Sequence, residues 1–187
     1  MTLYIGLMNL DFVLAVLLTV LMPLGLLVIA WQKPRLQQRL IGYWRVSALL
    51  MVSLYLLIAQ TPLGFVTGIL ARVLIPLRLV LPLEPSHVDS RVYRVFNVWR
   101  SITCGYCVVG VLWTLPLVHC LVWQSAVCRA WYVPATSFRQ LIHPTVAPHL
   151  LGWVGGIGVV IYCIAFGWLF GRAYRANTWR YVQRDDT

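Results

Sequence analysis

Four long apolar runs dominate this sequence, and each is long enough to cross the hydrocarbon core of a membrane as a helix. The runs cover about 12–31, 42–59, 102–123 and 150–171. Lipid offers no hydrogen bonds to the backbone, so a segment that crosses it alone has to satisfy its own backbone groups as a helix. The sequence therefore predicts an all-α fold, a polytopic bundle of transmembrane helices.

Composition agrees with this class, because 60% of the 187 residues are hydrophobic and only 11% are charged. We expect residues 1–187 to form a single membrane domain that ends in a basic tail at 172–187. The first apolar run lacks the features of a cleavable signal, since no basic residue precedes Lys33 and no small-residue cleavage site follows a short apolar core. The first helix is therefore expected to remain in the mature protein.

A fifth segment, "PLGFVTGILARVLIPLRLVLPL" at 62–83, is also long enough to span. It carries Arg72, Arg78 and three prolines, and proline interrupts helical hydrogen bonding. The segment is therefore compatible with a kinked span, a re-entrant hairpin or an interfacial helix.

The charge of the loops favours the spanning form. The chain has 15 basic and 5 acidic residues, a net charge of +10. If 62–83 spans and the N-terminus is outside, ten basic residues fall on the inner side, against Arg129 and Arg139 outside. We therefore expect five spans, with the N-terminus outer or lumenal and the C-terminus cytoplasmic. The basic excess indicates anionic lipids as partners rather than nucleic acid.

Acidic residues are few, and all five lie at span ends, in a loop or in the tail: Asp11, Glu84, Asp89, Asp185 and Asp186. A coupled transporter or an aspartyl membrane protease needs a carboxylate within the membrane, so neither class is expected, and we identify no catalytic residues. The same pattern predicts that Arg72 and Arg78 have no acidic partner at their depth. These arginines would then snorkel to the interface or contact a lipid phosphate or a partner subunit.

Cysteines form two groups. Cys104 and Cys107 lie three residues apart and share a helix face, so they could pack together, act as a redox pair or form half of a metal site. No second CxxC or nearby histidine completes a zinc set, and packing is the preferred interpretation; we expect no metal site. Cys120 and Cys128, in the outer region, are compatible with a disulfide or with two free thiols.

Two further features are candidates for contacts. His119 lies near the outer end of the fourth span, where a neutral imidazole can ligate chlorophyll magnesium or haem iron, or simply bind a neighbouring group. Gly152 and Gly156 form a GxxxG pattern, which lets helix backbones approach closely, either inside the bundle or with a partner.

The stretches "YWRVSALLMVSLYLLI" at 43–58 and "PLGFVTGILARVLIPLRL" at 62–79 resemble a family of uncharacterised integral membrane proteins from cyanobacteria. The later "HP" loop and the small-residue-rich last helix are similar too, so the likeness covers most of the chain. The resemblance implies a photosynthetic membrane, either the thylakoid or the cytoplasmic membrane of a cyanobacterium. It brings no residue with an assigned role.

Together these features predict a non-catalytic accessory subunit or assembly factor of a photosynthetic membrane complex, with a photosystem as the first candidate. Such a protein would act through helix–helix and lipid contacts, and chlorophyll, carotenoid or bound lipid are its candidate cofactors. A small transporter or channel with an Arg-lined path is the alternative.

Overall fold

The computed structural model describes residues 2–31, 33–80 and 90–185, and these are helical with short connections. The elements are α1 (Thr2–Val16), η1 (Leu17–Leu21), α2 (Met22–Ile29), α3 (Pro34–Ile58), α4 (Leu63–Val80), α5 (Ser90–Thr114), η2 (Leu115–Leu121), α6 (Ala126–Ile142) and α7 (Pro148–Asp185). Five helical stretches are long and apolar enough to cross a membrane: Gly6–Ile29, Leu36–Ile58, Leu63–Val80, Arg91–Leu121 and Pro148–Trp168. The predicted all-α membrane bundle is confirmed.

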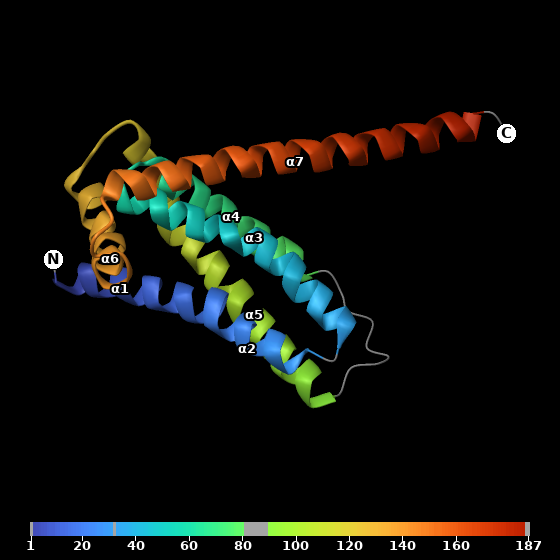
Figure 1. Ribbon diagram of the computed structural model, residues 1–187, viewed down its shortest axis with the longest axis horizontal. Helices are drawn as coiled ribbons and strands as arrows, with labels where there is room; N and C mark the ends of the chain where they lie inside the picture. The colour runs from blue at the N-terminus through green and yellow to red at the C-terminus, as the bar shows by residue number, and fades with distance from the viewer. Residues whose placement is uncertain (1, 32, 81–89, 186–187) are drawn as a thin grey trace.

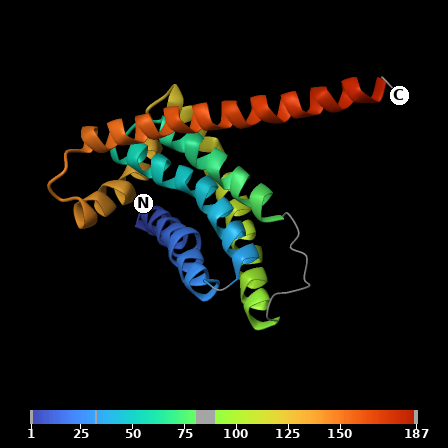
Figure 2. The ribbon, with the colours of Figure 1, turned by 45° about the vertical axis from the view of Figure 1, so that its right-hand side comes forward.

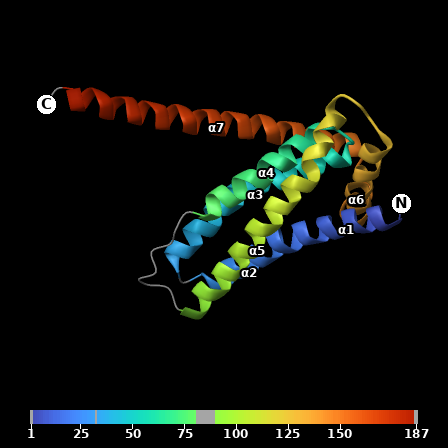
Figure 3. The ribbon, with the colours of Figure 1, turned by 180° about the vertical axis from the view of Figure 1, so that it is seen from behind.

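The centre of the bundle is the antiparallel pair α3 and α4, with α5 against α4 and the start of α7 against α3 (Figure 1). A tight turn at Gln60, whose φ is 55°, joins α3 to α4. In this turn the Thr61 N–H donates to the Leu56 carbonyl at 2.8 Å, which satisfies a free carbonyl at the end of α3. The view from behind shows α5 running alongside α4 (Figure 3).

The segment with the two arginines is one continuous helix over its described part. α4 includes Pro76 and does not reverse direction, so the structure excludes the re-entrant hairpin for 63–80. Residues 81–83, which the sequence analysis included in this span, lie outside the described residues.

The outer region at 124–149, expected to be a loop, contains the helix α6. Ser125 caps its first turn, because its Oγ accepts a hydrogen bond from the Cys128 N–H. α6 contacts both α1 and α3, and it runs across α1 rather than along it (Figure 1). The expectation of a loop is therefore corrected: a helix of 17 residues, which is not among the five candidate spans, covers this end of the bundle.

Several helix ends also differ from the sequence-based spans. The first span begins at Gly6 instead of near 12, and α3 already begins at Pro34, within a polar run. The largest difference is at the C-terminus, where α7 continues as a single helix to Asp185 instead of ending near 171 in a tail.

The first span is interrupted by a π-helical turn, η1, directly before Pro23. Proline has no N–H, so one carbonyl about a turn before it loses its helical donor. Side chains of other helices donate to two carbonyls of this turn: Trp99 Nε1 donates to the Leu18 carbonyl at 2.9 Å, and Tyr43 Oη donates to the Thr19 carbonyl at 3.0 Å. Tyr43 and Trp99 are fully buried in the main core cluster, so the irregular turn fixes α1–α2 against α3 and α5.

Candidate functional site

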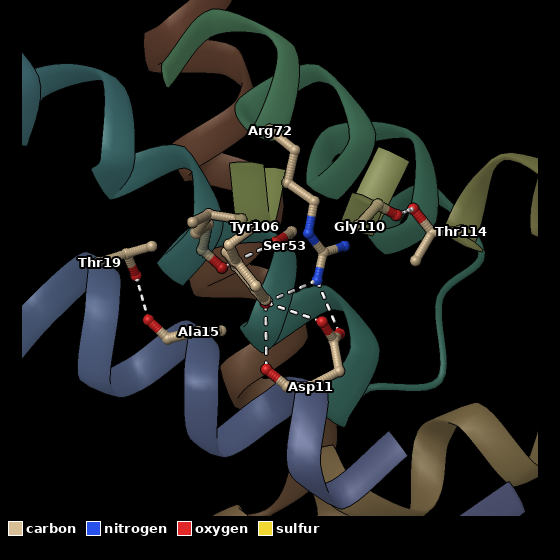
Figure 4. Close-up of polar contacts among 9 residues, drawn as sticks. Asp11, Ala15, Thr19, Ser53, Arg72, Tyr106, Gly110 and Thr114 are labelled. Carbon is tan, nitrogen blue, oxygen red and sulfur yellow. Dashed lines mark hydrogen bonds and ion pairs between the residues drawn. The ribbon is translucent and has the colours of Figure 1, made fainter. Parts of the chain in front are cut away.

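A buried arginine occupies the middle of the bundle. Arg72, in α4, is only 9% exposed, and its Nη2 lies 2.8 Å from Asp11 Oδ2 of α1. The same nitrogen donates to Tyr106 Oη of α5 at 3.3 Å, and Tyr106 Oη donates to Asp11 Oδ1 at 2.8 Å. Three helices distant in sequence are thus joined by one polar triangle, which Figure 4 shows in close-up.

This geometry overturns the expectation that Arg72 has no acid at its depth. Asp11 was assigned to the end of the first span, but that span begins at Gly6, so Asp11 lies within it. An arginine paired with a carboxylate avoids most of the cost of an isolated charge in hydrocarbon. Sequence reasoning also missed Tyr106, which stands between the two cysteines of the CxxC.

Gly110 makes room for the arginine. A Cβ at this position of α5 would lie 2.8 Å from Arg72 Nε and 2.9 Å from Arg72 Cδ. Any side chain here would therefore push the guanidinium away from Asp11. A single glycine in an apolar helix was the only sequence signal for this contact, and it did not indicate a partner.

Most donors of the Arg72 guanidinium remain unused within the described part of the chain. Guanidinium carries five N–H groups, and both observed bonds come from Nη2. Nε is buried without a hydrogen-bond partner, and Nη1 donates to no described residue. The ion pair with Asp11 therefore leaves hydrogen-bonding capacity free beside it.

A pocket of about 120 Å³ adjoins this arginine. Side chains of α1, η1, α3, α4 and α6 form its mostly apolar walls, and Arg72, Asp11 and Thr114 lie at its polar part. The pocket is partly open to the surface rather than sealed. Apolar walls with a few placed polar groups are typical of sites for small apolar ligands.

Arg78 lies apart from this site. It is exposed in the last turn of α4, where its guanidinium faces Gly42 of α3; a Cβ on Gly42 would lie 2.5 Å from Arg78 Nη2. A cation at the end of a helix is favourable to the helix dipole. Arg72 is buried within the bundle whereas Arg78 is exposed, so the two arginines have different surroundings.

Cys120 and Cys128 form a disulfide, which resolves the alternative left open by the sequence. His119 is exposed beside it, with Nδ1 bonded to the Pro116 carbonyl and Nε2 3.7 Å from Cys128 Sγ. These three residues cluster closely enough to hold a metal ion, but the joined sulfurs cannot act as thiolate ligands. Because Nδ1 of His119 is bonded to the Pro116 carbonyl, Nε2 is the one atom of this group that remains available as a ligand.

Cys104 and Cys107 are free thiols in the middle of α5. Cys107 is fully buried in the main core cluster, and Cys104 is half-buried against it. A redox role was considered because a helix N-terminus activates a thiol, but α5 begins at Ser90, four turns earlier. That electrostatic argument for a redox pair no longer applies.

The glycines of α7 that contact α3 are three residues apart, not four as in the GxxxG pattern. Added Cβ atoms at Gly152, Gly155 and Gly158 would meet Ala59, Leu56 and Val52 of α3 at 2.5, 3.1 and 2.7 Å. In contrast, Gly156 has nothing within 4 Å. Gly152 is therefore an internal packing residue, whereas Gly156 faces away from that contact.

Residues 6–175 match the family described as "Protein of unknown function (DUF3177)". The chain belongs to this family. The match includes the Arg72–Asp11 pair, the disulfide and most of α7. No curated protein and no solved structure matches the chain.

The description of DUF3177 names no activity, so function has to be argued from the geometry. Among the described residues, the charged groups inside the bundle bind one another: Asp11 accepts from both Arg72 and Tyr106. A carboxylate with two such donors is a structural acceptor rather than a free general base.

Proposed function

We propose that the protein is a non-catalytic accessory subunit or assembly factor of a larger membrane-protein complex. The observation that carries this proposal is α7. Of the most apolar 18-residue window in its spanning part, Pro148–Trp168, only 11% is buried in the chain, whereas the corresponding share in Leu63–Val80 is 39%. Figures 1 and 2 show α7 crossing the end of the bundle and then diverging from it, with the C-terminus far from the other helices.

The length of α7 supports a role outside the bundle. A helix of 38 residues is about 57 Å long, whereas the hydrocarbon core of a membrane is about 30 Å thick. A considerable part of α7 would therefore extend beyond the bilayer. A helix with one end anchored by glycines to α3 and the other end free presents a long surface to a neighbouring protein.

Orientation is part of the proposal. The disulfide lies at the end of the bundle that also holds α6 and the turn at Gln60, and disulfides persist in oxidising compartments. That end would face the outer or lumenal side, so the far end of α7 would be cytoplasmic. The distribution of basic residues between the loops favours the same orientation.

The setting that we propose is a photosynthetic membrane, with a photosystem as the first candidate partner. Support comes from the likeness of 43–58 and 62–79 to cyanobacterial membrane proteins. The extensive apolar surface of α7, which includes Trp153, Ile161 and Trp168, is compatible with contacts to helices, lipid or pigment.

The test is a native gel of membranes solubilised in mild detergent, with the full chain carrying an epitope tag. We expect the tag to migrate with a large pigmented band. A chain that ends after residue 168 keeps all five spans but lacks the far part of α7, so it should insert yet leave that band.

Gly25→Leu provides the matched control, because Gly25 has no neighbour within 4 Å and lies away from α7. This variant should migrate like the parent. Migration of the parent only at its own mass, under conditions that keep the pigmented complexes intact, would refute the proposal.

A further inference from the structure

Arg72, which lines the pocket, has hydrogen-bonding capacity that the described chain does not use. Arg72 is more than nine-tenths buried, its Nε has no partner, and its Nη1 makes no hydrogen bond to the described residues. Trp131 of α6 also lines the pocket, and its Nε1 is buried without a partner. A buried donor without an acceptor costs about 1–3 kcal/mol, so such a group is a reason to look for a ligand.

The hydroxyl groups of the pocket use their hydrogens within their own helices. Thr19 donates to the Ala15 carbonyl at 2.5 Å, Ser53 to the Leu50 carbonyl at 2.7 Å, and Thr114 to the Gly110 carbonyl at 2.7 Å. Each hydroxyl hydrogen is thus engaged within its own helix (Figure 4 shows Thr19 and Thr114). The pocket donors that remain without a partner in the described chain are therefore N–H groups of Arg72 and Trp131, and an N–H group requires an acceptor oxygen.

Charge balance decides what kind of acceptor fits. Arg72 is already neutralised by Asp11 at 2.8 Å, so an anionic ligand would add an uncompensated negative charge beside a carboxylate. Burying such a charge is costly, whereas a carbonyl oxygen accepts hydrogen bonds without adding charge. The apolar walls from Phe12, Leu54 and Phe65 then suit a hydrocarbon ring or chain.

We propose that this pocket binds a neutral, membrane-soluble molecule through a carbonyl oxygen that accepts from Arg72. The pocket, at about 120 Å³, holds the carbonyl-bearing part, and the rest of the molecule leaves through its open side. Two sources share this chemistry: a quinone or other ketone, and the ester group of a neutral lipid. The site is distinct from His119 and from α7, and it does not depend on the proposed partner complex.

The experiment uses the full chain purified in detergent and three probes: decylubiquinone, dioleoylglycerol and oleate. Binding is measured as probe retained with the protein after gel filtration over a series of concentrations. We expect saturable retention of at least one neutral probe and none of oleate. The neutral probe that binds identifies the source, and mass spectrometry of molecules extracted from the purified protein provides an independent comparison.

Two variants locate the binding site. Gly68 lines the pocket, and its added Cβ would meet only Ser53 at 3.6 Å, so Gly68→Leu fills part of the pocket while both members of the ion pair stay in the chain. Arg72→Lys keeps the charge opposite Asp11 but removes the guanidinium donors. Each variant should weaken retention about tenfold or more, the effect of losing about 1.4 kcal/mol. Gly25→Leu, the same substitution at an open position outside the pocket, should retain probe like the parent.

Several outcomes would overturn the proposal. These are retention of oleate alone, retention of no probe by the parent, and a neutral probe that binds Gly68→Leu and Arg72→Lys as well as it binds the parent. If Gly68→Leu does not yield a monodisperse helical protein, Arg72→Lys and the extracted molecules decide.

Discussion

A single residue pair fixes the centre of this bundle. Asp11 and Arg72 are 61 residues apart in the sequence and lie on different helices, and they meet at 2.8 Å with Tyr106 completing the polar group. Inside a membrane, burying the two charges as a pair costs little free energy, whereas burying either charge alone costs much more. The position of α1 against α4 and α5 therefore depends on both members.

Asp11→Asn should lower the free energy of unfolding by about 3–5 kcal/mol, because Arg72 then keeps its charge without a counter-ion. The measurement is reversible unfolding in mixed detergent micelles, followed by circular dichroism. The double variant Asp11→Leu/Arg72→Leu should be more stable than Asp11→Asn, since no buried charge remains. A double variant less stable than Asp11→Asn would contradict this account.

The π-helical turn before Pro23 gives a second test at this scale. Tyr43→Phe removes the donor to the Thr19 carbonyl and should destabilise the protein by about 1–3 kcal/mol. In a Pro23→Ala background the helix regains an N–H, so the same change should cost less. Equal costs in the two backgrounds would show that the N–H at position 23 does not replace the hydrogen bond from Tyr43.

At the scale of elements, the least predictable helix was α6. Its apolar residues are interrupted by Arg129, Pro134 and Arg139, so it lacks the continuous run that identifies a span. The buried side of α6 is formed by Cys128, Trp131, Tyr132 and Ala135, spaced for one helical face. The spans themselves were predictable because apolar length alone identifies them, whereas a short helix on the bundle surface depends on contacts that sequence spacing does not show.

The disulfide holds the start of α6 to the end of η2. The double variant Cys120→Ser/Cys128→Ser should lose about 2–3 kcal/mol, the entropy expected from closing a loop of about eight residues. Hydrogen exchange across Ala126–Ile142 should rise, while exchange in α4 stays low. Cys163→Ser, at an exposed free thiol, is the control and should change neither quantity.

The two glycines of the GxxxG pattern differ in their surroundings, because only one of them lies at the contact between α3 and α7. Gly152→Leu should destabilise the protein by about 1–3 kcal/mol, because its new Cβ would lie 2.5 Å from Ala59 Cβ, an atom that moves only with its backbone. The identical change at Gly156 meets nothing within 4 Å and should leave the unfolding temperature unchanged. Equal losses at both positions would mean that α7 packs on α3 with another face.

For the whole molecule, the sequence did not predict which residues of different spans contact one another. Apolar length predicted five helices, but Asp11 was read as an end residue because the first span was drawn from the apolar run at 12 onward. The partner of Arg72 depends on how the helices pack. So does the space provided by Gly110, which is 38 residues from Arg72 in the chain. Local patterns carry no information on such distant contacts.

Orientation is tested by labelling. Arg180→Cys places a thiol in the far part of α7, and a membrane-impermeant maleimide should reach it only from the cytoplasmic side. Thr2→Cys, at the start of α1, should be labelled only from the opposite side. The parent chain controls for its native thiols. Labelling of position 180 from the outer side would remove the five-span topology with the C-terminus inside.

The pairing of Asp11 with Arg72 also has a consequence for the order of events during synthesis. The first helix leaves the ribosome well before α4, so Asp11 is already in the membrane when the segment with Arg72 arrives. A lone arginine near the centre of a helix costs a few kcal/mol on entering the bilayer. We therefore expect α4 to insert efficiently only when the helix with Asp11 is present. The first helix would then assist the membrane insertion of a helix that is synthesised after it.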